Sequence, residues 1–359
     1  MSIITVNGII EADKLGIVSP HEHALIDMRT QFMELLEISK INLSNQKVGI
    51  ENIFQLKRNP FLIKDNLILD DPKVAEDELL EFKSAGGDTI VDASSVGLGR
   101  DPITLRRISR NLNLNIVLGC GYYVAFSQSI GISKKTIEEI ADEMINDIEV
   151  GICESSIESK LIANGSKGQN TGIRAGVIGE IGTSEIIYPF EKKVLIAAAR
   201  VQSRTGLGVL VHTNPWAKRG LEILDILEKN GADLKKVVIC HVGVTIDMEY
   251  YKQIIKRGSY IEFDDFGKEF IMDGKKLLFA TDIERIDAII ELINDGCIFN
   301  ILMSVDVCLK SLLHKYGGCG YDHILTNIVP IMIRRGLTMN QINVIIKNNP
   351  KKLLDSNLR

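Results

Sequence analysis

Four of the six histidines in this chain adjoin short runs of Val, Ile and Leu, and two acidic residues occupy positions of the same kind. One pair is His21-x-His23 in GIVSPHEHAL, and the other two histidines end the runs GVLVH and VVICH. The full set is His21, His23, Glu180, His212, His241 and Asp306. Imidazoles and carboxylates are ligands of zinc and similar divalent ions in catalytic sites. The pattern predicts a metal site assembled from the ends of several buried strands.

Six such ligands suffice for two ions and for a hydrolytic reaction. Residues i and i+2 of a strand point to the same face, so we expect His21 and His23 to hold one ion together. Glu180 is expected to bridge two ions, with the two later histidines on the second ion and Asp306 on the first. A hydroxide shared by the ions would attack a carbonyl or phosphoryl centre. Asp306 would accept the proton of the bridging water and pass it to the leaving group.

Each of these residues also has a structural interpretation. A single strand histidine is more often a core or capping residue than a ligand, and Glu180 could pair with a buried arginine instead. Convergence of the whole set on strand ends favours the metal interpretation. The remaining histidines, His314 and His323, lie in helix-like or loop sequence and are predicted to be structural. Cys240 precedes His241 and is predicted to face the other side of its strand, in the core.

Apolar runs of strand length recur along the chain with helical patterns between them. The strand candidates are Gly16–Ser19, Thr89–Ala93, Asn115–Gly119, Gly176–Ile181, Gly208–His212, Val237–His241, Tyr260–Phe263 and Asn300–Ser304. The helix candidates are Lys73–Ala85, Pro102–Leu112, Lys135–Ile152, Pro189–Thr205, Lys218–Asn230 and Ile283–Asp295. Such alternation predicts an α/β fold of the (β/α)8 TIM-barrel type, with the metal site at the C-terminal ends of the strands.

A doubly wound sheet is the alternative architecture, and it normally carries a Gly-rich phosphate turn after its first strand. No GxGxxG or GxxxxGK[ST] motif occurs in this chain, so nucleotide binding is not expected. We expect one hydrolase domain over residues 1–359, with a long excursion at about 29–71 above the barrel mouth. The segment 267–281 is a second long loop, and both are expected to shape a substrate pocket.

The composition is that of a soluble globular protein, with 45% hydrophobic and 25% charged residues and a net charge of −5. No Lys/Arg block indicates nucleic-acid binding. Six cysteines without a CxxC pair are typical of reduced thiols in a cytosolic protein. The N-terminus is unlike a signal peptide, and no run approaches the roughly 18 to 20 apolar residues of a membrane span. We therefore expect a cytoplasmic protein that acts on a small molecule.

The order of the motifs resembles that of the phosphotriesterase family, within the amidohydrolase superfamily, and in particular its phosphotriesterase-related branch. The resemblance rests on PHEH, GGDTIVDASSVGLGRD, GEIGTSE, LVHTNP, ICHVG, IEFDDFG and LMSVDV. It implies a barrel with two divalent metal ions, usually zinc, and a possible homodimer. It also implies that His21, His23 and Asp306 bind the more buried ion, and His212 and His241 the more exposed one.

One departure from that family concerns the residue that bridges the metals. Phosphotriesterases proper use a carboxylated lysine on the fourth strand, but the matching segment RAGVIGEIGTSE contains no lysine. Glu180 is the nearest acidic residue, and the phosphotriesterase-related branch is similar in using Glu there. A direct Glu bridge requires the strand to approach the metals more closely, which Gly179 and Gly182 would permit.

The missing lysine moves the expected substrates from phosphotriesters towards carbonyl compounds, namely small esters, lactones or N-acyl amides. Tyr122 and Tyr123 after the third strand and Asp264 at the end of the seventh are the expected substrate contacts. Organophosphate hydrolysis and a non-catalytic barrel that retains its metals are the alternatives. An aldolase or radical barrel would need a strand-end lysine or a cysteine cluster, and the predicted strand ends carry neither.

Overall fold

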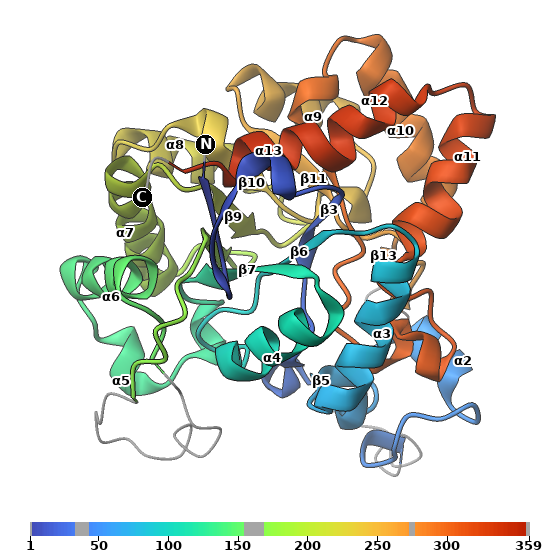
Figure 1. Ribbon diagram of the computed structural model, residues 1–359, viewed down its shortest axis with the longest axis horizontal. Coiled ribbons are helices and arrows are strands. Elements are labelled where there is room, and N and C mark those ends of the chain that lie inside the picture. Colours follow the sequence, from blue (N-terminus) through green and yellow to red (C-terminus); the bar gives the residue numbers. More distant parts are fainter. Residues whose placement is uncertain (1, 33–42, 154–168, 273–276, 357–359) are drawn as a thin grey trace.

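The computed structural model describes residues 2–32, 43–153, 169–272 and 277–356 (Figure 1). Its centre is an eight-stranded sheet in the order β14-β11-β10-β9-β8-β7-β6-β3, with parallel pairing between neighbours. The strands are β3 (Val18–Glu22), β6 (Thr89–Asp92), β7 (Asn115–Cys120), β8 (Val177–Gly182), β9 (Val209–His212), β10 (Val237–Ile239), β11 (Tyr260–Phe263) and β14 (Ile301–Met303). Each overlaps a predicted strand, so the predicted barrel is confirmed.

The first and last strands meet through a side chain. Glu22 at the end of β3 accepts the backbone N–H of Val305 at 3.1 Å and that of Val307 at 2.8 Å, just after β14. Ser19 donates its hydroxyl to the same carboxylate at 2.6 Å. Burial is the main cause that raises the pKa of Glu22 to about 7. A carboxylate thus links β3 and β14, the two strands at the ends of the sheet order.

The interior of the barrel is packed with aliphatic side chains. One residue from each strand belongs to this inner core: Val18, Val91, Val117, Val177, Leu210, Val238, Tyr260 and Leu302. The hairpin of β1 (Ser2–Thr5) and β2 (Gly8–Glu11) adds Ile3, and the final helix α13 (Asn349–Leu354) adds Leu353 and Leu354. The side chains fill the barrel, so it is a packed core and not a pore.

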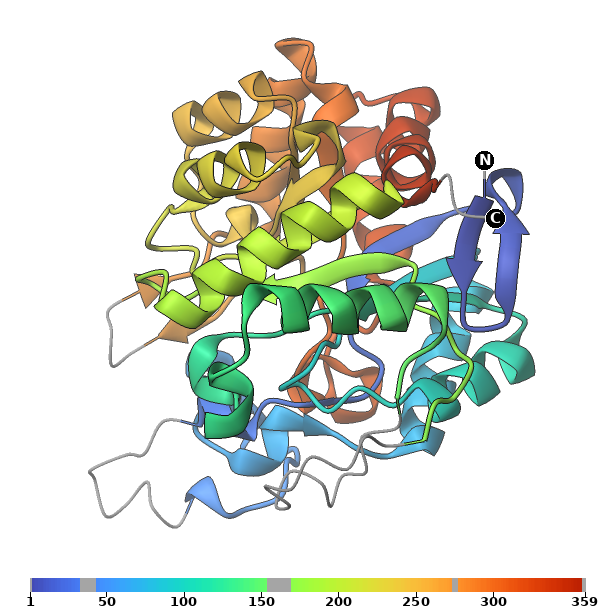
Figure 2. The ribbon, with the colours of Figure 1, turned by 90° about the vertical axis from the view of Figure 1, so that its left-hand side faces the viewer.

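The helices surround the sheet in Figures 1 and 2. The longer ones are α3 (Pro72–Ser84), α4 (Pro102–Leu112), α6 (Ile137–Glu149), α7 (Pro189–Thr205), α8 (Gly220–Lys229), α9 (Met248–Lys256) and α10 (Asp282–Asn294). All but α9 were predicted, and α4 and α7 have the predicted bounds. After β14 the chain continues through α11 (Val329–Arg334), α12 (Met339–Asn343) and α13. No helix in the described part of the chain is long and apolar enough to cross a membrane.

Two insertions interrupt the alternation of strands and helices. The first is enclosed by antiparallel pairing of β4 (Ile26–Asp27) with β5 (Ile68–Leu69), and it contains the short helix α2 (Ile53–Arg58). The second follows β11 and contains the paired strands β12 (Ile271–Met272) and β13 (Leu277–Leu278). Residues 33–42 of the first insertion and 273–276 of the second lie outside the described residues. Both insertions contribute side chains to the cavity described below.

Candidate metal centre

The four histidines and two carboxylates expected at strand ends come together at one place. Glu180 lies in the middle, with Oε1 3.4 Å from Nε2 of His23 and Oε2 3.2 Å from Nδ1 of His212. Its Oε2 is also 3.6 Å from Nε2 of His21 and 3.7 Å from Nε2 of His241. Asp306 lies beyond the edge of this group, and its Oδ1 is 3.2 Å from Nε2 of His23.

Strict alternation along the strands would not have turned all of these side chains inward. Val18 and Val177 face the barrel interior, and His21 and Glu180 each lie three residues further on. The register of β3 shifts between Ser19 and Glu22, and that of β8 shifts between Ile178 and Ile181. Such irregularities change the side to which later residues point. They are the reason that His21 and Glu180 reach the centre.

Glycine allows the irregularity in β8. Gly179 has a φ of 133°, and a Cβ there would lie 2.5 Å from the backbone oxygen of Leu210. A Cβ on Gly182 would lie 2.1 Å from the backbone nitrogen of Val124. Neither position has room for a side chain. This agrees with the expectation that Gly179 and Gly182 let the strand approach its neighbours closely.

The turn after β10 aims His241 in a different way. Val238 and Cys240 both face the barrel interior, so alternation would send His241 outward. His241 instead adopts a left-handed backbone with a φ of 62°, which returns its side chain to the mouth. Cys240 is buried in the core, as predicted. The expectation that it and His241 lie on opposite sides of the strand was wrong, because its thiol lies inside the barrel, 3.2 Å from Oε2 of Glu262.

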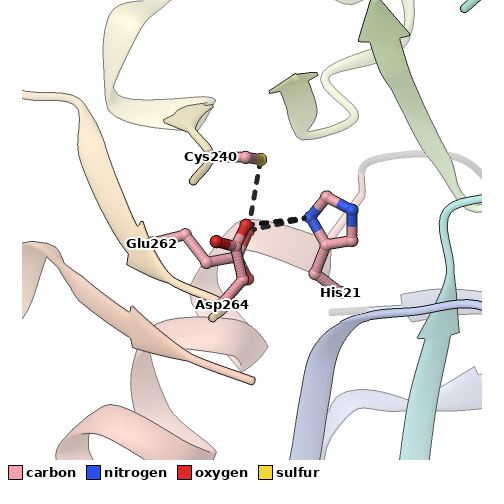
Figure 3. A group of neighbouring side chains, drawn as sticks. All are labelled: His21, Cys240, Glu262 and Asp264. Atoms are coloured by element: carbon pink, nitrogen blue, oxygen red, sulfur yellow. Dashed lines mark hydrogen bonds and ion pairs between the residues drawn. The ribbon is translucent and has the colours of Figure 1, made fainter. Parts of the chain in front are cut away.

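Beneath the centre, the carboxylates of Glu262 in β11 and of Asp264 just after it hold His21 (Figure 3). Nδ1 of His21 lies 3.3 Å from Oε2 of Glu262 and 3.4 Å from Oδ2 of Asp264. All three side chains are fully buried. Burial opposes protonation of His21, but Cys240, Glu180 and Glu262 outweigh it and raise the pKa of His21 well above its usual value. Because Nδ1 is engaged from below, Nε2 is the nitrogen turned to Glu180.

The other three imidazoles follow the same rule, with one nitrogen on a protein partner and the other towards the centre. His23 places Nδ1 2.9 Å from the hydroxyl of Ser94, and His241 places Nδ1 3.1 Å from Asp264. His212 places Nε2 3.3 Å from the hydroxyl of Tyr123. A partner on the second ring nitrogen is typical of metal-binding histidines, because it fixes both tautomer and ring orientation.

The donor atoms facing the centre fit divalent metal ions. Nε2 of His21, Oε2 of Glu180 and Oδ1 of Asp306 are buried and form no hydrogen bond within the described chain. Nδ1 of His212 lies only 2.7 Å from Nε2 of His241, so two ring nitrogens converge on the same point. Burial would raise the pKa of Glu180, but the four surrounding histidines hold it well below its usual range. Glu180 is an anion at neutral pH, as a metal ligand must be.

A cavity of about 470 Å³ opens above this group. Its floor includes His23, Glu180, His212, His241 and Asp306. Its walls are largely aromatic: Phe32, Phe61, Tyr123, Phe126, Trp216, Phe270 and Phe279. The rings of Trp216 and Phe279 are 5.7 Å apart and those of Phe279 and Phe270 are 5.4 Å apart, both edge to face. This size and lining suit a small organic substrate.

The three expected substrate contacts lie in different places. Tyr123 lines the cavity, as expected. Tyr122 has its ring against Phe190, and its hydroxyl pairs with Glu143 away from the metal centre. Asp264 is buried under His21 and His241 and is occupied by them. Of the three, the geometry offers only Tyr123 to a substrate.

Two groups at the centre were not anticipated from the sequence. Glu262 stands two residues before Asp264, so the period of a strand could have indicated that both face inward. Lys268, in the segment FGKEF, lines the cavity and pairs its ammonium group with Asp306. Burial opposes the charge of Lys268, but Asp306 and its neighbours raise the pKa of this lysine. A lysine in a loop carries no periodic signal that would have revealed this position.

The remaining histidines lie apart from the centre. His314 pairs with Asp322 at 2.5 Å, and His323 pairs with Asp282 at 2.8 Å. These two contacts support the structural interpretation of both histidines. Arg100, which lies shortly before α4, also forms a structural pair, with Asp147 at 2.7 Å.

Comparison with known proteins adds relatives to this geometry. Residues 1–354 match the phosphotriesterase family. The chain is 37% identical to an N-acetyltaurine hydrolase of Dictyostelium discoideum, over 98% of this chain and 97% of that protein. It is 33% identical to the N-acetyltaurine hydrolase of Homo sapiens, again over 98% and 97% of the two chains. Both alignments span the whole barrel.

Solved structures agree in fold. A resiniferatoxin-binding protein from Rhodobacter sphaeroides has a TM-score of 0.90 and 34% identity, over 99% of this chain and 95% of that chain. A phosphotriesterase homology protein from Escherichia coli, solved with phosphate in its active site, has a TM-score of 0.75 and 26% identity, over 96% and 100%. The barrel fold is therefore shared with both proteins.

Proposed function

This chain belongs to the phosphotriesterase family of hydrolases, and on that premise we propose that it cleaves small N-acyl amides with two divalent metal ions. The observation that carries the proposal is the common arrangement of the four imidazoles. Each has one nitrogen on a protein partner and the other directed to the group around Glu180. A purely structural cluster would have no reason to leave buried donor atoms unpartnered.

We assign the first ion to His21, His23 and Asp306, and the second to His212 and His241. Glu180 would hold both ions, since its Oε1 faces His23 and its Oε2 faces His212 and His241. Two ions held there would lower the pKa of a water molecule and polarise the carbonyl oxygen of the substrate. By family resemblance the metal is zinc, although a set of histidines and carboxylates also accepts manganese or cobalt.

Asp306 is the proposed proton carrier. It is buried at the base of the cavity, and Lys268 and His23 lower its pKa against the opposing effect of burial. It would accept the proton of the attacking water at a carboxylate oxygen and deliver it to the leaving nitrogen. Water and the amide are thereby converted into a carboxylic acid and an amine, which exchange a proton at neutral pH to give a carboxylate and an ammonium ion. Tyr123, 3.3 Å from His212, is positioned to contact the carbonyl oxygen.

The amide class is favoured over the other carbonyl substrates because relatives that are 37% and 33% identical to this chain are N-acetyltaurine hydrolases. N-acetyltaurine is therefore the first substrate to test. Lactones are the second class, because a PTE-like lactonase variant from Deinococcus radiodurans has 25% identity and a TM-score of 0.74. The aromatic walls of the cavity accept either class.

The test combines metal analysis of the purified protein with a substrate panel of N-acyl amides, lactones, carboxylic esters and a phosphotriester. We expect about two metal ions per chain and highest turnover on an N-acyl amide. Less than one ion per chain, with no hydrolysis restored by added zinc or manganese, would contradict a metal-dependent hydrolase. Turnover of lactones alone would retain the metal centre and replace the substrate class.

Three broader properties belong to the same proposal. We propose one domain over residues 1–359 and a possible homodimer, by resemblance. A cytoplasmic location is supported by the six cysteines, all of which are free thiols.

A further inference from the structure

Lys268 occupies an unusual position at the cavity. Its side chain lines the cavity and is only 4% exposed. Among the described residues that line the cavity, it is the single lysine or arginine. We propose that Lys268 binds an anionic group, a sulfonate or a carboxylate, on the amine part of the substrate. This inference rests on the proposed function and adds a requirement to it: preferred amides are acidic.

The loop that carries Lys268 is held in place before any substrate arrives. Its preceding residue, Gly267, donates its N–H to Oδ1 of Asp282 at 2.9 Å. The backbone oxygen of Lys268 accepts from the fully buried guanidinium of Arg285 at 2.9 Å. The same guanidinium donates to the oxygen of Gly243, close to His241. The loop of Lys268 and the turn of His241 are therefore tied to one side chain, which positions the ammonium relative to the metal centre.

The ammonium group has donors to spare. A lysine carries three N–H donors. Within the described chain, Lys268 forms one side-chain hydrogen bond, to Asp306, and its Nζ lies 3.8 Å from Asp265, beyond hydrogen-bond range. Two donors are thus free for a ligand. A buried charge of this kind is costly unless it is fully paired, and an anion in the cavity would complete the pairing of the ammonium group.

Two neutral donors among the lining residues add to this capacity. Nε1 of Trp216 and Nε2 of Gln31 are buried and have no hydrogen-bond partner in the described chain. A sulfonate has three acceptor oxygens and a carboxylate two, so either can take several donors at once. Unpartnered N–H groups that line the same cavity as a buried cation are suited to an anion and poorly suited to an apolar substrate.

The competing explanation is that Lys268 serves only to neutralise Asp306 and Asp265. The two explanations differ in substrate dependence. A lysine that acts through Asp306 changes the hydrolysis of charged and neutral amides alike. A lysine that also binds the substrate's anion changes the hydrolysis of the charged amides far more than that of the neutral one, and it does so through KM more than through kcat.

Direct binding is measured first, on zinc-loaded protein. Trp216 is the only tryptophan of the chain and lines the cavity, so its fluorescence reports occupancy. The probes are ethanesulfonate, propanoate and neutral propanamide, and calorimetry follows the same titrations. We expect both anions to bind more tightly than propanamide, and Lys268→Met to weaken them about 10- to 100-fold, the effect of one charge-assisted hydrogen bond. Metal content must equal that of the wild type, because anions also bind zinc.

Kinetics then separate the two anion types and the two explanations. The substrates are N-acetyltaurine, N-acetyl-β-alanine and the neutral N-acetylethanolamine. Lys268→Met should raise KM for the two acidic amides and lower their kcat/KM at least about tenfold more than that of the neutral amide, and Lys268→Arg should restore part of this difference. The matched control is Lys310→Met, since Lys310 pairs with Asp65 and lies outside the cavity lining.

Each outcome decides the question. Equal losses of kcat/KM on all three amides, or an anion affinity that is the same in Lys268→Met as in the wild type, would overturn the inference. If the wild type hydrolyses no amide, the proposed function fails, while the binding titrations still decide whether Lys268 holds an anion. A preference for sulfonate over carboxylate, or the reverse, identifies the source of the charge.

Discussion

Asp264 accepts the backbone N–H of His241 on both of its carboxylate oxygens, at 2.9 and 3.0 Å, and also lies 3.1 Å from Nδ1 of the same residue. One carboxylate thus holds both the left-handed backbone of His241 and the orientation of its ring. Burial is the main cause that raises the pKa of Asp264 to about 7, and His241 opposes that rise. The metal centre depends on this second layer as much as on the ligands themselves.

Asp264→Asn is expected to preserve the fold and to weaken metal binding about 10- to 100-fold, the usual effect of losing such a partner. The amide keeps one acceptor oxygen, and its NH₂ group would face either the backbone N–H or the ring N–H of His241, neither of which can accept a hydrogen bond from it. Metal content after dialysis against a graded chelator series measures the change, and circular dichroism checks the fold. Glu262→Gln is the comparison, because Glu262 contacts His21 and not His241. If Asp264→Asn held both ions as tightly as the wild type, His241 would not be positioned by this contact.

Glu180→Gln is expected to lose most of the metal and most of the activity. The substitution keeps the size of the side chain but replaces one oxygen with an NH₂ group, which cannot bind a cation. Metal analysis and amide hydrolysis are measured on the same preparation. A variant that kept two ions and full activity would mean that another group spans them.

Gly179→Ala should destabilise the protein by more than the left-handed backbone alone accounts for. The added Cβ would lie 2.5 Å from the backbone oxygen of Leu210, where no side-chain movement can relieve it. Gly231→Ala is the matched control, since it also has a positive φ (94°) but its nearest atom lies 3.9 Å away. We expect about 1 kcal/mol for the control and several kcal/mol for Gly179→Ala, together with loss of metal. Urea unfolding measures both, and equal costs would remove the argument from close strand approach.

Asp282→Asn should lower the free energy of unfolding at neutral pH and make this free energy depend less on pH in the acidic range. Burial raises the pKa of Asp282, but its bonds with His323, Gly267 and Arg285 outweigh burial and lower it. Because the folded-state pKa lies below the unfolded one, the stabilisation is present above about pH 4 and is lost as the pH falls further.

The expected cost of Asp282→Asn is about 3 kcal/mol at pH 7, since it leaves the buried Arg285 without its anion. Urea midpoints between pH 3 and pH 7 measure the difference, which should shrink towards pH 3. Asp287→Asn on the same helix is the control, because its pair with Arg335 is exposed and should contribute little. A difference that stayed constant with pH would rule out the ionised carboxylate as its cause.

The sequence was sufficient for the elements and for the ligand types. Continuous apolar runs revealed all eight barrel strands, because a parallel sheet covered on both faces is apolar on both faces. The helices α4 and α7 have the predicted bounds, and each begins with a proline in its first turn and has a periodic pattern of apolar residues. The helix α9 was not predicted.

The direction of the side chains needed the tertiary structure. Val177 and Glu180 both face the barrel interior although they are three residues apart, and His241 follows the inward-facing Cys240 directly. A period of two cannot produce either arrangement. Shifted registers and a left-handed residue do. Gly179 allows the close strand approach in β8, and Asp264 holds the left-handed backbone of His241.

By itself, the sequence determined the barrel and the set of groups able to bind metal, because hydrophobic periodicity and residue chemistry are local properties. Only the tertiary structure decided which atoms face the ions and which hold them. His21 and Glu262 meet although they are 241 residues apart, and Lys268 reaches Asp306 from a loop without any regular pattern. Contacts of this kind depend on the closing of the barrel, which brings distant strand ends to one mouth.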